Sequence, residues 1–236
     1  MEAKGLFREA FEFKETRGFI ISDSRSAIAT GMASLKQNRE KLEKYIREHP
    51  KFLYSLQPVQ ADDGPPVVRL MAKAAKKADV GPMAAVAGVL ADLAVEDMLL
   101  KGAHVAVVEN GGEASAASDR PINTALLAGD NFLSRKIGFR LENFPVGVAT
   151  SSGVFSHALS FGDAEAVTIF AENAGLADAA ATAVGNVVKG NDHREAIKRG
   201  IAKALSIEGV SGVFILYKGM VGRAGRVPKI IGISLT

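Results

Sequence analysis

Three short segments of the chain carry residue types that could bind a phosphate or a metal ion. The first ends the apolar run HVAVVEN, where Asn110 is followed by Gly111, Gly112 and Glu113. Consecutive glycines let backbone N–H groups converge, and such a nest can bind a phosphate without a side chain in the way. An ordinary tight turn is the alternative interpretation, because Asn-Gly pairs favour turns.

The second segment is GVATSSG, in which Thr150, Ser151, Ser152 and Gly153 follow a short apolar run. Three hydroxyl groups and a glycine provide small hydrogen-bonding groups on a loop that a ligand can approach closely. A polar turn without a ligand is the alternative. His157 follows, but the Gly-x-Ser-x-Gly pattern of a serine hydrolase is absent around the two serines.

The third segment, ADAAAT, opens an alanine-rich helix and places Asp178 four residues before Thr182. Their oxygens therefore lie on one helix face. A carboxylate beside a hydroxyl suits a hard cation such as Mg²⁺, which prefers oxygen ligands and shares its other positions with phosphate and water. The alternative is structural: the helix dipole stabilises an early aspartate, and a threonine can bond to the carbonyl four residues earlier.

Composition excludes several other kinds of site. The chain has no cysteine, which removes disulfide bonds, thiolate zinc sites and cysteine nucleophiles. Its four histidines are dispersed and predict no metal triad. The net charge is +3, and no aromatic residues interleave with the basic ones, so we expect no nucleic-acid partner.

Targeting signals are not evident either. The N-terminal segment MEAKGLFREAFEFKE is charged throughout and does not resemble a signal peptide. The most apolar region, residues 80–108, contains four charged residues between its apolar runs and is too short to predict a membrane span. We therefore expect a cytoplasmic protein that does not enter a membrane.

Hydrophobic periodicity predicts the elements that must position the three segments. Helices are expected over 26–48, 67–77, much of 80–102, 174–188 and 194–206. Strands are expected within 11–21 as an edge hairpin, and over 104–110, 147–150, 166–170, 212–218 and 229–235. The stretch 58–66 contains three prolines and predicts a long loop. This mixture lacks a strict β-α-β rhythm and predicts the α+β (mixed α/β) class.

The order of the three segments resembles the ApbE family of FAD:protein FMN transferases. That family has a Gly-Gly-Asp turn, then a Thr-Ser-Gly loop, then an Ala-Asp-x-x-x-Thr helix start. Upstream, VAGVLAD resembles its Ala-Lys-Gly-x-x-x-Asp segment: Gly88 and Asp92 match, whereas Ala87 replaces the lysine. The histidine position is kept, but SFGDAEA stands where the family has Asp-Pro-x-Thr-Gly. The resemblance covers residues 80–190 and suits a divergent sister family.

The resemblance implies a two-lobed architecture related to a tandem T-fold, with FAD between the lobes. It further implies that Mg²⁺ is held by Asp178, Thr182 and the Val86 carbonyl. The residues that it places around the flavin nucleotide are Gly111, Gly112, Glu113, Thr150, Ser151, Ser152, Gly153 and His157. The family moves FMN from FAD to a threonine of an acceptor protein and releases AMP.

We accordingly predict one ApbE-like domain over residues 1–236. Its parts would be a less typical N-terminal region (1–66), a region that carries the motifs (67–190), and a C-terminal helix with strands (191–236). The leading hypothesis is a Mg²⁺-dependent flavin-nucleotide-binding transferase with an acceptor protein. The alternatives are a non-catalytic binding protein for a nucleotide or another phosphorylated metabolite, and an assembly protein. Helix 26–48 could pack internally or form a homodimer.

Overall fold

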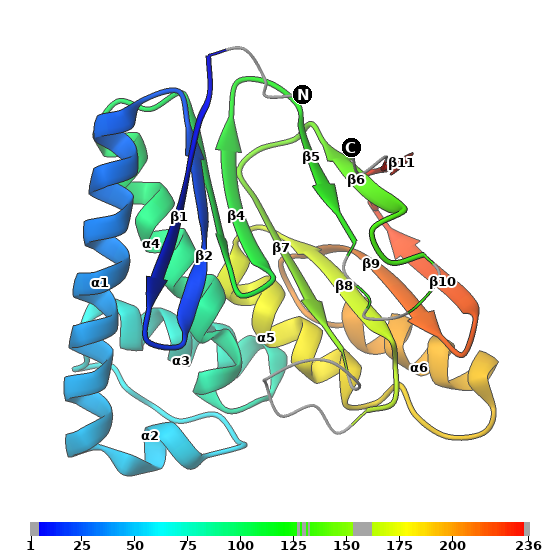
Figure 1. Cartoon of the computed structure of the whole chain (residues 1–236). Helices are drawn as coiled ribbons and strands as arrows, with labels where there is room; N and C mark the ends of the chain where they lie inside the picture. Colours follow the sequence, from blue (N-terminus) through cyan, green and yellow to red (C-terminus); the bar gives the residue numbers. More distant parts are fainter. Residues whose placement is uncertain (1–4, 127, 129–130, 132, 153–161, 234–236) are drawn as a thin grey trace.

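The computed structural model describes residues 5–126, 128, 131, 133–152 and 162–233. Its centre is an eight-stranded sheet in which all neighbouring strands are antiparallel (Figure 1). The strands lie in chain order: β1 (Phe7–Phe13), β2 (Thr16–Ser22), β3 (Val105–Asn110), β4 (Glu113–Ser118), β7 (Val146–Ser151), β8 (Ala166–Ala171), β9 (Val210–Tyr217) and β10 (Met220–Gly225).

The sheet consists of two halves with the same order of elements. In each half a hairpin is followed by helices and then by a second hairpin. The first half places its helices between β2 and β3: α1 (Arg25–Glu48), α2 (Pro50–Tyr54), α3 (Pro66–Ala78), the 3-10 helix η1 (Pro82–Ala85) and α4 (Val86–Leu100). The second half places α5 (Ala174–Gly185) and α6 (His193–Leu205) between β8 and β9. The α+β class and the tandem architecture predicted above are therefore confirmed.

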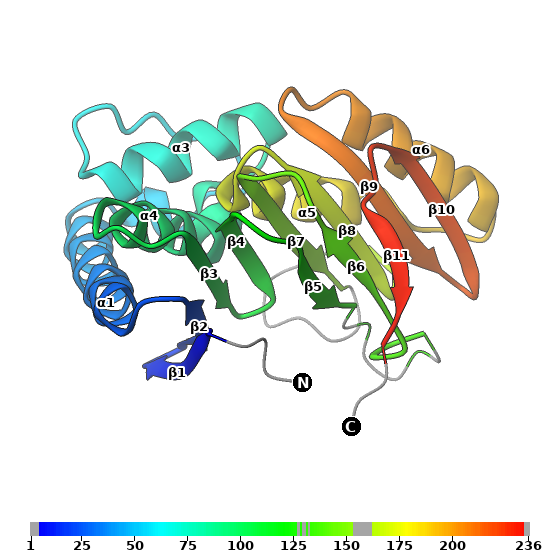
Figure 2. The ribbon, with the colours of Figure 1, turned by 90° about the horizontal axis from the view of Figure 1, so that it is seen from above.

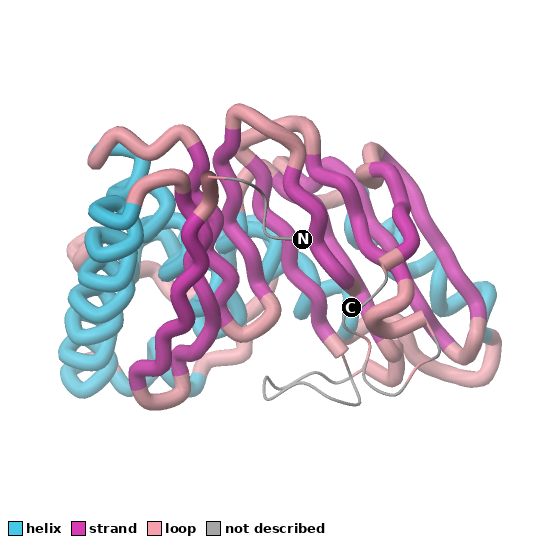
Figure 3. The backbone as a smooth tube through the Cα atoms, turned by 45° about the horizontal axis from the view of Figure 1, so that its top comes forward, coloured by secondary structure: helices cyan, strands magenta, loops and turns pink. Residues whose placement is uncertain are grey.

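The two halves join where β4 pairs with β7. Ala114 lies opposite Val148, and Ala116 lies opposite Val146. Figure 3 shows the strands of both halves side by side, with the helices gathered behind them. This junction brings the helices of the two halves together at the middle of the sheet, where α4 contacts α5.

The helices cover one face of the sheet, and a small second sheet covers part of the other (Figure 2). That three-stranded sheet contains β5 (Ile122–Ala125), β6 (Ile137–Leu141) and β11 (Lys229–Gly232). Strand β8 is buried on both sides because it lies between the layers. Val167 and Ile169 pack toward the helices, whereas Phe170 packs with Phe139 of β6.

Most elements occur where the sequence predicts them. Ser24 caps α1 by accepting a hydrogen bond from the Ala27 amide, as expected for a serine before an apolar period. Pro50 ends α1 but also opens the short helix α2, since proline suits the first position of a helix. Strands β4, β5, β6 and β10 were not predicted, because their sequences are short, rich in small residues or mixed in polarity.

No helix in the described part of the chain combines the length and the apolar composition that a membrane span requires.

Candidate functional site

The candidate site begins at the crossing of α4 and α5, whose N-terminal turns are in direct contact. A Cβ atom on Gly88 would collide with the carbonyl oxygen of Ala174, and one on Gly175 would collide with the side chain of Val89. Glycine at both positions thus allows the two helix N-termini to approach more closely than any other residue type would permit. The surrounding residues of α5 are small, because alanine makes up half of that helix.

Each of the two helices provides an aspartate to the N-terminus of the other. Asp92 of α4 accepts hydrogen bonds from the amides of Ala174 (2.9 Å) and Gly175 (2.8 Å) at the start of α5. Asp178 of α5 accepts one from the Gly88 amide (3.1 Å) at the start of α4. Both carboxylates therefore satisfy amides that a helix N-terminus leaves without an intrahelical partner.

Two polar side chains from the sheet complete this arrangement. Ser115 of β4 donates its hydroxyl to Asp92 Oδ1 at 2.7 Å. Asn110 of β3 donates its side-chain amide to the Ala87 carbonyl oxygen at 3.0 Å. Sequence reasoning placed Asp92 in a family-like segment but did not connect it to Ser115 or to α5. Only the packing of helix on sheet brings these residues together.

Glu113 lies beside this crossing on the face of the sheet that the helices cover. It pairs directly with Asn110 across the β3–β4 hairpin. Burial raises the pKa of Glu113 well above the usual value for glutamate, and the nearby Asp178 and Glu109 carboxylates raise it further. No salt bridge compensates Glu113 or Asp178 within the described residues. The result is a pair of carboxyl groups without a basic partner in the described chain, in a poorly solvated place where the charged form is disfavoured.

The pKa of Asp178 is raised for the same reason. Burial raises the pKa of Asp178 to about 7, although hydrogen bonds from the Gly88 and Ala87 amides oppose the shift. A neighbouring carboxylate, Asp92, raises it further. Proton uptake near neutral pH, or a bound cation, would relieve this repulsion.

Thr182 follows Asp178 by one helical turn on the same face of α5. Its hydroxyl forms no hydrogen bond within the described chain, so the alternative bond back to the carbonyl of Asp178 does not form. In α1, by contrast, the Thr30 hydroxyl donates to the Ser26 carbonyl oxygen four residues earlier. Val86 is the first residue of α4, directly before the amides that face Asp178. The three residues that the resemblance assigns to Mg²⁺ thus lie on the two crossing helices. Among the described residues no group of three or more histidine or acidic side chains is arranged to hold a metal.

Gly111 and Gly112 form the turn between β3 and β4, with φ angles of 73° and 117° that favour glycine. Both glycine amides already have protein acceptors. The Gly111 amide donates to the Arg17 carbonyl oxygen at 3.0 Å, and the Gly112 amide donates to Glu109 Oε1 at 2.7 Å. The turn therefore offers no free glycine amide to a phosphate in this structure, and its geometry corresponds to the tight-turn alternative.

The Thr150–Ser151 end of β7 lies at the same end of the sheet as that turn. The pairing of Ala114 with Val148 sets this register. The Thr150 hydroxyl lies 2.9 Å from the hydroxyl of Thr168 on the neighbouring strand. Ser152 is buried. Gly153 and His157 lie outside the described residues.

Comparison with known proteins agrees with the resemblance. A family model described as AbpE bacteria matches residues 8–210. The chain belongs to this ApbE-like family. A UPF0280 protein of Methanococcus vannielii is 38% identical over 231 residues, which cover 96% of this chain and 93% of the relative. A UPF0280 protein of Methanocaldococcus jannaschii is 37% identical, with coverage of 95% and 93%.

The fold of this ApbE-like protein is also found in solved structures. The apo form of the Pseudomonas stutzeri flavinyl transferase ApbE superposes with a TM-score of 0.63 at 13% identity, over 93% of this chain and 94% of that one. An ApbE protein of Thermotoga maritima superposes with a TM-score of 0.60 at 17% identity, over 93% and 97%. At these identities the likeness establishes the fold alone. The ApbE-like protein is thus a divergent member of the family, and its fold matches these structures over most of their length.

Proposed function

We propose that this ApbE-like protein is a Mg²⁺-dependent, flavin-nucleotide-binding transferase that moves FMN from FAD to a threonine of an acceptor protein. One observation carries the proposal: Glu113 and Asp178 are two neighbouring carboxyl groups at the crossing of two helix N-termini, in a place where burial disfavours their charged forms. A structural ion pair would contain a lysine or arginine at this place, and none is present among the described residues.

The donors present fit a hard divalent cation. Asp178 offers a carboxylate that accepts the Gly88 and Ala87 amides, and its two oxygens have further lone pairs that could bind a metal. Glu113 adds a second carboxylate, and the unengaged hydroxyl of Thr182 adds a neutral oxygen. Mg²⁺ is commonly held by one or two carboxylates, with substrate phosphates and water at its remaining positions. When bound there, the ion would offset negative charge on the pyrophosphate of FAD.

The surrounding amides explain why a cation would be required. The Asp92 carboxylate accepts the first amides of α5, and the Asp178 carboxylate accepts an amide at the start of α4. The turn amides donate to the Arg17 carbonyl oxygen and to the Glu109 carboxylate. These are the backbone positions at which a phosphate would otherwise bind. Because carboxylate oxygens and, at Gly111, a carbonyl oxygen already accept from these amides, a pyrophosphate would meet negative charge unless a cation lay between. Thr150 and Ser151 provide hydroxyls at the same end of the sheet to orient the nucleotide.

The transfer step itself follows from the pyrophosphate chemistry. The hydroxyl oxygen of the acceptor threonine would form a bond to the phosphorus of the FMN half, and the bond from that phosphorus to the bridging oxygen would break. AMP would leave with the bridging oxygen, and the hydroxyl proton would be released. The contribution of this chain would be to hold the ion and the nucleotide so that the acceptor hydroxyl faces the phosphorus.

A flavin-fluorescence titration with FAD, with and without Mg²⁺, tests the binding part. We expect tight binding that EDTA weakens and that Asp178→Ala and Glu113→Gln each weaken by about tenfold or more, as for loss of a charged ligand contact. Glu40→Gln, at an exposed position on α1, is the matched control and should bind as the unmodified protein does. Full Mg²⁺-dependent FAD affinity in Asp178→Ala would contradict the proposal.

A second function is favoured by one specific feature. Ala87 stands at the start of α4 where the family has lysine, so this cationic side chain is missing from the crossing. A non-catalytic binding protein for a nucleotide or another phosphorylated metabolite would not need it. AMP release from FAD in the presence of Mg²⁺ separates the two functions: its detection excludes the non-catalytic alternative, and FAD binding without AMP release favours it.

A further inference from the structure

A groove on the first half of the sheet lies outside the carboxylate site. Its volume is about 640 Å³, within the range of small-molecule sites. Its floor is a row across three strands, in which Ala10, Phe19 and Glu109 are direct neighbours. Glu109 and Asn110 are consecutive on β3 and point to opposite faces, and the Asn110 side chain bonds to the Ala87 carbonyl oxygen at the start of α4. The groove is therefore on the face of the sheet opposite the helices, whereas Glu113 and Asp178 lie on the helix side.

Two arginines flank this row from opposite sides. Arg8 lies two residues before Ala10 on β1, and Arg17 lies two residues before Phe19 on β2, so both side chains project from the groove face. The Arg8 guanidinium stacks over the Phe19 ring, with 4.1 Å between its central carbon and the ring centroid. This stacking fixes the plane of the guanidinium while its N–H edge remains available for an oxyanion.

Neither arginine forms an ion pair among the described residues, although Glu12 lies directly opposite Arg17 across the β1–β2 pair. Within the described part of the chain neither Arg8 nor Arg17 forms a salt bridge or a side-chain hydrogen bond. Glu109 is the acid of the groove, but its Oε1 accepts the Gly112 amide at 2.7 Å. Arg8 attracts Glu109 electrostatically without pairing with it. The groove thus has two exposed guanidinium groups and one lining carboxylate that the turn already engages, and the exposed Glu12 at its edge forms no ion pair with Arg17.

We propose that this groove is a second ligand site, which binds a planar organic phosphate of nucleotide size without a metal ion. Arg8 and Arg17 contact the phosphate, since a guanidinium matches two phosphate oxygens at once. The Arg8 guanidinium covers the Phe19 ring, so a planar ring would stack on the outer face of the guanidinium, beside Ala10. The groove shares Gly111 and Gly112 with the residues that the resemblance places around the flavin nucleotide, but the proposed contacts use neither Asp178 nor Glu113.

Calorimetric titration with ADP in the presence of EDTA tests the site, since chelation silences the Mg²⁺-dependent one. We expect saturable binding of ADP and at least about tenfold weaker binding of adenosine, which lacks the phosphates. Arg17→Gln and Arg8→Gln should each weaken ADP binding by about tenfold or more. Arg223→Gln is the matched control, because Arg223 is an exposed arginine on β10 at the other edge of the same sheet.

Several outcomes would overturn the proposal. These are the absence of ADP binding in EDTA, unchanged ADP affinity in a folded Arg17→Gln protein, and adenosine binding as tight as that of ADP. Binding of hexaglutamate in place of ADP would also overturn it and would indicate an acidic protein segment as the partner. Asp178→Asn should leave ADP binding in EDTA unchanged, so failure of this site and failure of the transferase proposal are distinguishable.

Discussion

Asp92 and Asp178 each cap the helix that carries the other. Asp92 belongs to α4 and accepts the first amides of α5, while Asp178 belongs to α5 and accepts an amide of α4. A residue that the resemblance assigns to metal binding is therefore also part of the contact between the two halves of the protein. Its position depends on Asp92, because Asp92 fixes the N-terminus of the helix on which Asp178 lies.

Asp92→Asn tests this dependence. The asparagine retains one acceptor oxygen but turns an NH₂ group toward donors, so at least one of the bonds from Ala174, Gly175 and Ser115 is lost. We expect a decrease of about 1–3 kcal/mol in the free energy of unfolding and weaker Mg²⁺-dependent FAD binding. Urea denaturation measures the first and fluorescence titration the second. Asp97→Asn on the same helix is the control, and an unchanged urea midpoint in Asp92→Asn would show that the reciprocal caps are unimportant.

Glycine at the helix crossing should be indispensable. Alanine at Gly88 would place a methyl group against the carbonyl oxygen of Ala174, and rigid backbone on both sides leaves no room to relax. We expect Gly88→Ala to lower the free energy of unfolding by about 2–3 kcal/mol or to prevent folding. Gly232→Ala, at a position with open space around it, should have the melting temperature of the unmodified protein. Equal melting temperatures for both variants would disprove the close crossing.

The stability of the metal-free protein should depend on Asp178 between about pH 4 and pH 7. Burial raises the folded-state pKa to about 7 from an ordinary value of 3.8, so the folded protein binds this proton more tightly than the unfolded chain does. The stabilisation is therefore complete below the unfolded pKa and is lost as the pH rises through 7. Compared with Asp178→Asn, the unmodified protein should lose stability on the order of a few kcal/mol across this range.

Urea denaturation in EDTA from pH 4.5 to 7.5 measures this difference. Millimolar Mg²⁺ should restore stability at the upper end, because the cation replaces the proton as the partner of the carboxylate. Parallel pH profiles for the two proteins would exclude a raised pKa of Asp178, and an absent Mg²⁺ effect would count against the metal site.

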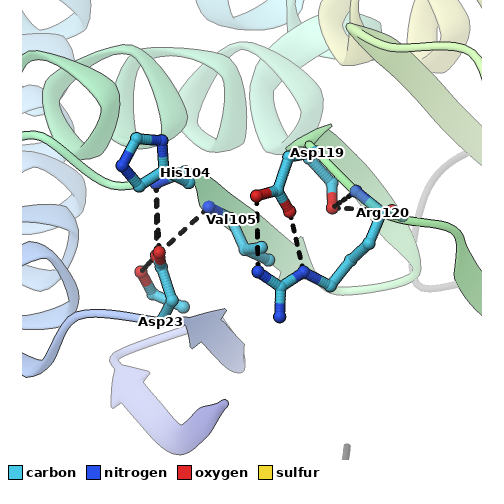
Figure 4. Close-up of polar contacts among 7 residues, drawn as sticks. Asp23, His104, Val105, Asp119 and Arg120 are labelled. Carbon is cyan, nitrogen blue, oxygen red and sulfur yellow. Dashed lines mark hydrogen bonds and ion pairs between the residues drawn. The ribbon is translucent and has the colours of Figure 1, made fainter. Parts of the chain in front are cut away.

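The contribution of Asp23 to stability should have the opposite pH dependence to that of Asp178, because its pKa is lowered on folding. It joins the end of β2 to the start of β3 by accepting the His104 and Val105 amides at 3.1–3.3 Å (Figure 4). Burial opposes its ionisation, but these bonds outweigh burial and lower its pKa. We expect Asp23→Asn to lower the free energy of unfolding by about 1–2 kcal/mol at pH 7.

The effect of Asp23 should shrink in acid. A lowered pKa contributes stability above the unfolded value of 3.8, and this contribution is lost as the pH falls through the lower folded value. Asp119→Asn is the control, because Asp119 is exposed and pairs only with the adjacent Arg120 in Figure 4. A difference between Asp23→Asn and the unmodified protein that persists at pH 3 would contradict this role.

The sequence by itself determined the elements whose signals are local. Ser24 and the apolar period after it define α1, and the buried runs of β3, β8 and β9 follow from unbroken apolar residues. The order of the glycine turn, the hydroxyl loop and the Asp-x-x-x-Thr helix also sufficed to indicate the family. Each of these signals is contained within a few consecutive residues, and the order of the three segments can be read along the chain, so neither requires knowledge of the fold.

Only the tertiary structure decided how these segments are used. The Gly111 and Gly112 amides donate to the Arg17 carbonyl oxygen and the Glu109 carboxylate. Asp178 caps α4, which begins 92 residues earlier at Val86, and not α5, the helix on which it lies. The Arg8 groove likewise exists only because β1, β2 and β3 are neighbours. Such contacts join residues far apart in the chain, and their partners are selected by packing of helices on the sheet, which local sequence patterns do not encode.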